Sequence, residues 1–305
     1  MLAVTKQRIG VLGATSLVGN YLLELLEQNA LEATAFTRRS IEQCPDSNGV
    51  EWVQLDLATD TLHPNAEEME PRTPTSGVEK IDDWISVAPI WVLPQHFALL
   101  KAYGIMRIAA LSSTSVFVKA DSSDPYEKDV ALRLSEGEEK LKTWANANGV
   151  QWIILRPTLI YGCGKDKNVA EIASFIRRFG FFPLFGRACG LRQPVHAEDV
   201  AAACLAVLQN SHNGSHAYDI SGGETIAYRD MVKRIFSALG LRPRLVTVPL
   251  WVFRIAISLL HILPRYRHWT TAMAGRMNQD LCFDHSEATR DFGYSPRAFE
   301  PFGEV

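Results

Sequence analysis

The sequence has few of the features that mark metal, disulfide-linked or nucleic-acid-binding proteins. Its 305 residues hold five cysteines, an odd number without the paired spacing of a metal site. The formal net charge of −3 gives no electrostatic reason to expect a nucleic-acid partner. No Walker loop, nucleophile elbow or metal-binding helix motif occurs in the sequence. Free thiols, and a first strand that begins where a signal peptide would stand, predict a cytoplasmic protein.

One apolar stretch, residues 248–263, is too short to span a bilayer and carries Arg254 and His261 within it. A basic and aromatic cluster follows at residues 264–269. Two interpretations stay open. The stretch is either a buried helix of a substrate-binding part, or an interfacial helix through which residues 248–269 make peripheral membrane contact beside a lipid-linked substrate.

Residues 9–19 read as an apolar strand that runs into a glycine turn and then a helix. Such a turn must bend tightly and let a pyrophosphate approach backbone N–H groups at the helix N-terminus, which favours glycine at its first and last positions. Gly13 and Gly19 meet these two requirements. Ser16 stands at the middle position, where its small side chain allows close approach and can donate to a phosphate. The turn therefore predicts a dinucleotide site, although similar turns also occur without a ligand.

A second strand, residues 33–36, ends in Thr37, Arg38 and Arg39. The end of this strand meets the adenosine ribose in a dinucleotide site, where arginines suit a 2′-phosphate. The pair therefore favours NADP over NAD, and the alternative is a solvated surface loop. A third strand, residues 50–55, stops at Asp56 and Leu57, where the acid can bond the adenine or cap the next turn.

Strands and helices alternate along most of the remaining chain. Strands are expected at 84–89, 106–111 and 150–155, with helices at 95–103 and 127–146. This order predicts the α/β class, a Rossmann-type doubly wound parallel sheet with a smaller C-terminal substrate-binding part. We expect residues 1–162 to form the NAD(P)-binding domain, with 196–220 returning to it. Residues 163–195 and 221–305 then form the substrate-binding part.

Five motifs occur in order, at residues 13–19, 56–57, 111–117, 155–162 and 192–200. Together they resemble the extended and atypical short-chain dehydrogenase/reductases, the NAD(P)-dependent epimerase/dehydratase family that holds nucleotide-sugar epimerases. The resemblance implies that the cofactor is bound by Gly13, Thr15, Ser16, Leu17, Val18, Gly19, Arg38, Arg39, Asp56, Leu57, Ala88, Pro157 and Thr158. It further implies that Ser113 bonds the reacting oxygen of the substrate. Arg192 would reach a substrate diphosphate, unless it pairs with a surface carboxylate.

The sequence departs from this family at the proton-transfer pair. The family places a Tyr four residues before a Lys on one helix face, and spacing from residues 155–157 puts these positions at Val130 and Leu134. No Tyr with a Lys four residues later occurs between residues 121 and 150. Tyr126 is the one nearby candidate for a displaced acid, and Lys128 lies too close to share its face. The alternative is that Tyr126 only packs at a helix start.

Two further side chains stand just before an expected helix at 200–208. Asp199 is expected to cap it, and His196 is expected to act as a structural hydrogen-bonding group and not as a base. The sequence as a whole predicts an NAD(P)-binding oxidoreductase or epimerase-like protein, with NADP favoured and NAD open. Its substrate would be a nucleotide sugar or a related carbinol, and a homodimer stays open. The competing hypothesis is a catalytically silent dinucleotide-binding protein with a sensor or structural role.

Overall fold

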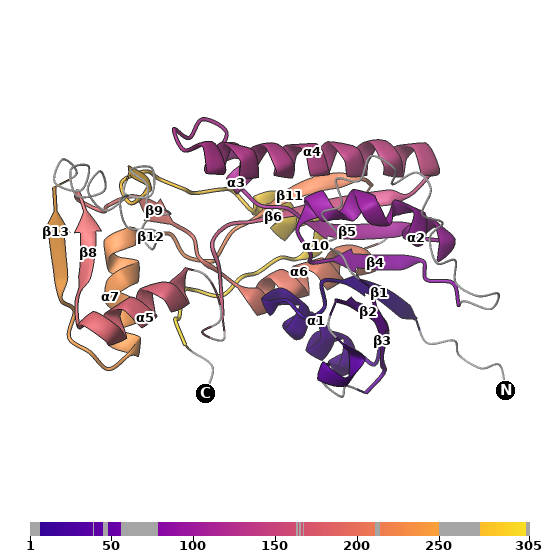
Figure 1. The fold of residues 1–305 in the computed structure, drawn as a ribbon, viewed down its shortest axis with the longest axis horizontal. Helices are drawn as coiled ribbons and strands as arrows, with labels where there is room; N and C mark the ends of the chain where they lie inside the picture. The colour runs from indigo at the N-terminus through magenta and orange to yellow at the C-terminus, as the bar shows by residue number, and fades with distance from the viewer. Residues whose placement is uncertain are drawn as a thin grey trace.

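The computed structural model describes residues 7–38, 40–44, 48–55, 79–162, 164, 166, 168–210, 214–249 and 275–302. A seven-stranded sheet in the order β11-β6-β5-β4-β1-β2-β3 forms its larger part (Figure 1). The strands are β1 (Arg8–Leu12), β2 (Glu32–Thr37), β3 (Val50–Gln54), β4 (Asp83–Ser86), β5 (Arg107–Leu111), β6 (Gln151–Pro157) and β11 (His216–Ile220). Every pairing is parallel. The strand order reverses between β1 and β4, which is where open parallel sheets bind ligands. The predicted doubly wound sheet is confirmed.

Helices cover both faces of this sheet. On one face α1 (Leu17–Gln28) packs beside α6 (Ala197–Gln209), with α10 (Ser286–Phe292) next to α6. The other face is covered by the 3₁₀ helix η2 (Ile90–His96), by α2 (Phe97–Ala102) and by α4 (Pro125–Asn148), which lies along the top of the sheet in Figure 1. The central strands β1, β2, β4 and β5 are almost fully buried because helices cover both faces of the sheet, whereas the edge strands β3 and β11 are partly exposed.

A smaller part lies to the left of the sheet in Figure 1. It contains α5 (Val169–Phe179) and α7 (Tyr228–Ala238), which share a third apolar core, and the paired strands β8 (Phe182–Phe185) and β13 (Leu245–Val248). Short pairs link the two parts: β7 (Ile160–Tyr161) with β10 (Val195–His196), and β9 (Leu191–Arg192) with β12 (Ile226–Ala227). The remaining short elements are η1 (Ile41–Gln43) and α3 (Ser115–Val118).

Most predicted elements occur within a few residues of their expected bounds. The predicted helix at 95–103 is α2, and the 3₁₀ helix η2 precedes it directly; Pro94 within η2 has no backbone N–H to donate. One local prediction needs correction. Asp199 does not cap α6, which begins at Ala197. The cap is His196, whose Nδ1 accepts the backbone N–H of Glu198 at 3.3 Å. His196 is therefore a structural group, as expected.

The apolar stretch at 248–263 and the cluster after it lie almost entirely outside the described residues. Among the described helices, none has the length and apolar character needed to cross a membrane.

Candidate functional site

The turn after β1 has the geometry that a bound pyrophosphate requires. Gly13 has a φ of +82°, and a Cβ added there would lie 2.6 Å from the backbone nitrogen of Ala88. A Cβ on Gly19 would collide with the backbone of Ala14, so the helix packs closely against the turn. Both positions therefore require glycine for steric reasons, as the sequence predicts.

Ser16 caps α1, and its Oγ accepts the N–H of Gly19 at 3.1 Å. The hydroxyl proton remains available to a ligand, because Oγ acts as the acceptor in that bond. Leu17 and Val18 occupy the first two helical positions, where backbone N–H groups have no acceptor within the helix. The side chain of Val18 is buried, so only its main chain can face a ligand.

A cavity of about 470 Å³ opens beside this turn. It is lined by Gly13, Thr15, Ser16, Phe36, Thr37, Arg38, Val87, Ala88, Pro89, Trp91, Val92, Gln95 and Arg133. We name it the turn cavity. Arg38 is exposed at the end of β2, and no described carboxylate pairs with it. Arg39, Asp56 and Leu57 lie outside the described residues, so their predicted roles stay predictions.

A second cavity, of about 480 Å³, lies where β5 and β6 end. We name it the serine cavity, and its lining is Ser113, Thr114, Ser115, Val118, Lys119, Thr158, Leu159, Ile160, Asn168, Arg192, Gln193, Tyr228, Arg276, Met277, Leu281 and Phe283. Ser113 Oγ accepts the N–H of Ser115 at 3.1 Å, which leaves its proton free to donate. Thr158 donates to the carbonyl of Gln193, and Pro157 before it is buried.

No aspartate or glutamate is among the residues that line the serine cavity, whereas Lys119 and Arg276 both line it. Burial, together with the charge of Arg276, lowers the pKa of Lys119 despite the opposing charge of Asp124. Arg276 forms an ion pair with the buried Glu127, and burial lowers the pKa of its guanidinium. The charged side chains that line the cavity are thus all cations, which favours an anionic ligand.

Arg192 lines the same cavity, but its guanidinium is already engaged. It is 5% exposed and donates to the backbone carbonyls of Leu191 and Gln279, both at 2.7 Å, and to that of Arg276. Burial lowers its pKa. The alternative that Arg192 pairs with a surface carboxylate is wrong, because its partners are carbonyl groups. These bonds hold the segment that carries Arg276 against β9.

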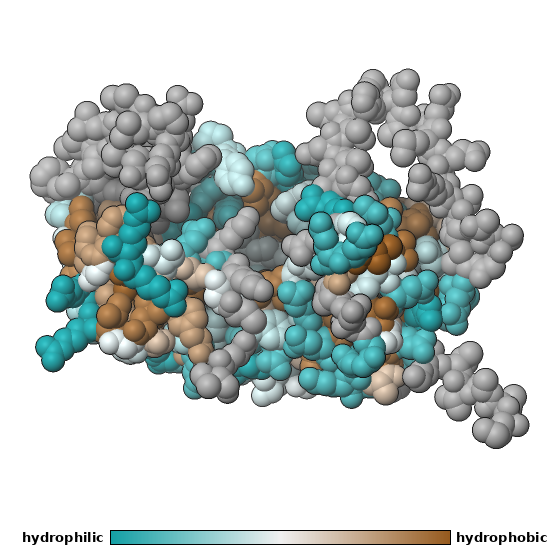
Figure 2. All heavy atoms as spheres, turned by 60° about the horizontal axis from the view of Figure 1, so that its bottom comes forward, coloured by the Kyte–Doolittle hydropathy of each residue, from teal (hydrophilic) through white to brown (hydrophobic). Residues whose placement is uncertain are grey.

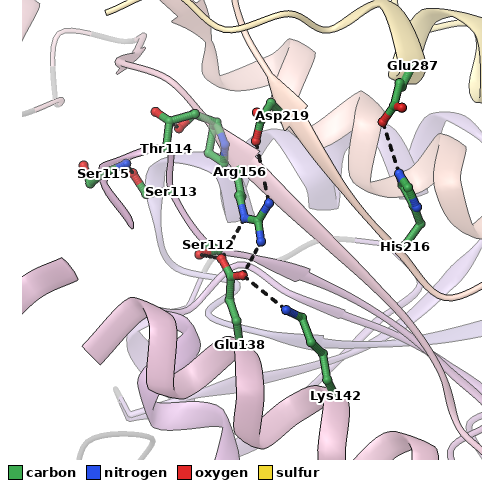
Figure 3. A network of polar contacts seen from close by, with 11 residues as sticks. Ser112, Ser113, Thr114, Ser115, Glu138, Lys142, Arg156, His216, Asp219 and Glu287 are labelled. Atoms are coloured by element: carbon green, nitrogen blue, oxygen red, sulfur yellow. Dashed lines mark hydrogen bonds and ion pairs between the residues drawn. The ribbon is translucent and has the colours of Figure 1, made fainter. Parts of the chain in front are cut away.

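A buried network of polar side chains connects α4 to the ends of β5 and β6, next to residues that line the serine cavity (Figure 3). Glu138 on α4 has a side chain 3% exposed and accepts from Ser112 at 2.6 Å and from Arg156 Nε at 2.9 Å. Burial alone would raise the pKa of Glu138, but the hydrogen bonds from Arg156 and Ser112 outweigh it and lower the pKa. The Arg156 guanidinium also lies 4.0 Å from Asp219. The network joins the ends of β5 and β6 just before Ser113 and Thr158, so it fixes the relative positions of those two residues.

The helix α4 carries apolar groups where the family places its proton-transfer pair. Leu134 is 4% exposed in the core, and Val130 packs against the same cluster. Tyr126 follows the cap of the helix, Asp124, and is 73% exposed. Tyr126 is absent from the lining of both cavities, and its predicted catalytic role gains no support from this position.

Three ionisable residues that line the serine cavity could not be identified as site residues from the sequence: Lys119, Tyr228 and Arg276. Burial raises the pKa of Tyr228 to about 12. Each stands outside the recognised motifs, and their approach to Ser113 depends on how the smaller part folds back onto the sheet. The sequence carried no local signal for that contact.

Comparisons with known proteins agree with this architecture. Residues 97–221 match the model of the NAD dependent epimerase/dehydratase family. A chloroplast stem-loop binding protein of 41 kDa from Arabidopsis thaliana is 25% identical over 249 residues, which cover 78% of this chain and 65% of that protein. A UDP-glucose 4-epimerase from Vibrio cholerae is 23% identical over 162 residues, 50% of this chain and 49% of that enzyme. The matches thus span about half to two thirds of these relatives.

Solved structures share the fold over nearly the whole chain. MoeE5 in complex with UDP-glucuronic acid and NAD superposes with a TM-score of 0.70 at 17% identity, covering 96% of this chain and 94% of that one. A UDP-glucuronic acid 4-epimerase from Bacillus cereus in complex with NAD gives 0.68 at 15% identity, with 96% and 93% covered. The family resemblance predicted from the motifs is confirmed. Residues 97–221 are similar to the NAD dependent epimerase/dehydratase family, and the chain shares its fold with these solved structures.

Proposed function

We propose that this chain is an NADP-dependent oxidoreductase or epimerase-like protein that acts on a carbinol of a nucleotide sugar. The observation that carries the proposal is the placement of two cavities along the edge where the parallel strands end. One is lined by the glycine turn and Arg38, and the other by Ser113 and three cationic side chains, those of Lys119, Arg192 and Arg276. Parallel α/β sheets bind a dinucleotide and its substrate along this edge.

The cofactor half of the proposal uses the turn cavity. Backbone N–H groups of Leu17 and Val18, with the hydroxyls of Thr15 and Ser16, would hold the pyrophosphate. Arg38 would hold the 2′-phosphate, since its guanidinium is exposed on that cavity without a described carboxylate partner. Bound NADP would supply or accept a hydride at its nicotinamide. The similar solved structures contain NAD, so experiment must decide between NADP and NAD for this chain.

The substrate half uses the serine cavity. Ser113 would donate to the reacting oxygen, and Arg276 and Lys119 would attract the diphosphate of the substrate. Lys119 and Tyr228 line this cavity, and we propose them as proton donors in place of the Tyr/Lys pair that α4 lacks. Burial lowers the pKa of Lys119 and raises that of Tyr228, so the lysine releases its proton more readily.

The test has two stages. Calorimetric titration with NADPH measures cofactor binding, and incubation with NADP⁺ and either UDP-glucose or UDP-glucuronic acid measures formation of reduced nicotinamide. An epimerase that returns its hydride is detected separately, by chromatography of the sugar nucleotides. Cofactor binding with turnover that Ser113→Ala abolishes would support the proposal. Unchanged turnover in Ser113→Ala would refute the role of Ser113.

Binding of NADPH without turnover of either sugar nucleotide would favour the alternative, a dinucleotide-binding sensor that has lost its proton-transfer pair. Cytoplasmic localisation and a homodimer remain predictions. Size-exclusion chromatography with light scattering checks the second.

A further inference from the structure

We propose that the outer end of the smaller part docks on the surface of an anionic membrane. The docking surface, which we name the basic–aromatic patch, consists of Arg178, Phe179, Phe181, Leu241, Arg242 and Arg244. Its residues come from the end of α5 and from the segment between α7 and β13. The proposal is independent of the catalytic cavities and of the proposed function.

Contacts bring the two segments of the patch together. Phe179 and Phe181 have ring centroids 6.5 Å apart, and the Arg178 guanidinium lies 5.3 Å from the centre of the Phe179 ring. The backbone of Arg244 accepts the N–H of Phe182 at 2.9 Å, where β13 begins to pair with β8. The loop that carries Leu241 and Arg242 is thereby fixed beside the phenylalanines.

The apolar side chains of the patch face solvent. Phe179 is 52% exposed, Leu241 42% and Phe181 36%. In Figure 2 apolar side chains gather at the left end of the molecule, where α5, β8 and β13 lie, and hydrophilic side chains extend around them. A group of large exposed apolar side chains on one surface is unusual for a protein without a binding partner there.

The charge of the patch has one sign. Arg178, Arg242 and Arg244 are exposed, and none of them pairs with a carboxylate in the part of the chain that the structure describes. The sequence has no aspartate or glutamate from 172 to 189 or from 239 to 249. Arg178 also complements the C-terminal dipole of α5, but Arg242 and Arg244 lie beyond any helix end.

Exposed aromatic rings with arginines around them match a lipid headgroup region, where rings enter the interface and cations meet anionic lipids. A nucleic acid would need a more extended basic surface, and the net charge of this chain is −3. An acidic protein would also complement this combination, because aromatic residues and arginine are enriched at protein interfaces. We commit to the membrane, and wild type that does not bind the vesicles would point to a protein partner instead.

The experiment is flotation of the full chain with vesicles of phosphatidylcholine, with or without phosphatidylserine. Two variants alter the patch: R178Q/R242Q/R244Q removes its charge, and F179S/F181S removes its rings. The matched control K101Q/K140Q/R290Q removes three exposed cations from α2, α4 and α10. Circular dichroism and thermal unfolding establish that each variant is folded.

We expect the wild type and the control to float with phosphatidylserine vesicles and to be released by salt. Removal of each arginine should weaken partitioning of the protein onto the vesicles about fivefold. The charge variant should therefore partition roughly a hundredfold more weakly than the wild type. The ring variant should also lose binding, and if it fails to fold the charge variant still decides. Wild type that remains unbound, or a charge variant that binds as well as the control, would overturn the proposal. Binding to heparin in place of vesicles would also overturn it.

Discussion

Replacing Glu138 with glutamine should destabilise the protein far more than the same change at its neighbour Glu139. Glu138 is 3% exposed and bonds both Ser112 and Arg156, whereas Glu139 is 67% exposed and pairs with Lys142 at 2.7 Å. Removing one partner of a buried ion pair leaves the other charge without compensation and costs about 3–5 kcal/mol. An exposed pair contributes less than about 1 kcal/mol.

Glu138→Gln should lower the free energy of unfolding by about 3 kcal/mol, the lower end of that range, because the amide can still accept one of the hydrogen bonds. Urea unfolding, followed by tryptophan fluorescence, measures it against Glu139→Gln as the control. The double variant E138L/R156M removes both charges and should be less destabilised than Glu138→Gln alone. Equal stabilities for Glu138→Gln and Glu139→Gln would refute this account of the network.

The pH dependence gives a second readout of the same pair. The pKa of Glu138 is lowered in the folded protein, so its contribution to stability is complete above its unfolded-state pKa of about 4.3. That contribution is lost as the pH falls through the lower folded-state pKa. The difference in unfolding free energy between wild type and Glu138→Gln should therefore be largest near neutral pH and shrink in acid. If this difference in unfolding free energy instead grows on acidification, the pKa of Glu138 is not lowered in the folded protein.

Three further predictions address the cavities. Gly13→Ala should abolish NADPH binding and lower the unfolding free energy by about 1–3 kcal/mol. Gly149→Ala, also at positive φ but with no atom within 4 Å of its added Cβ, should keep NADPH binding in the same calorimetric titration. Arg38→Gln should weaken NADPH binding about tenfold or more and leave NADH binding unchanged, since only NADPH has the 2′-phosphate; equal losses for both cofactors would contradict this. Lys119→Met should raise the Kd for UDP about tenfold without changing the Kd for NADPH, which competition titrations can check.

The sequence was sufficient to predict the sheet because its signals are local. Buried parallel strands are apolar runs, and the turn at Gly13 and Gly19 has steric needs that only glycine meets. Ser113 was identified through the family resemblance, which rests on the motif at residues 111–117. These features depend on neighbours in the chain and therefore can be recognised without the fold.

The serine cavity could not be predicted in the same way. Lys119 and Arg276 are far apart in the sequence, and the bonds from Arg192 to the carbonyls of residues 276, 279 and 191 help to hold Arg276 in place. The resemblance implied that Arg192 reaches a substrate diphosphate, whereas in the structure its guanidinium donates to these backbone carbonyls. His196 likewise took the capping position expected for Asp199, because α6 begins two residues before that aspartate.

Binding of a dinucleotide at the glycine turn is the central claim, and titration of the folded protein with NADPH, NADP⁺, NADH and NAD⁺ tests it most directly. We expect saturable heat with tighter binding of NADPH than of NADH. At a ligand concentration roughly 100 times Kd, binding should stabilise the fold by about 2.7 kcal/mol, which appears as a rise in Tm. No heat and no shift in Tm with any of the four forms would contradict the claim.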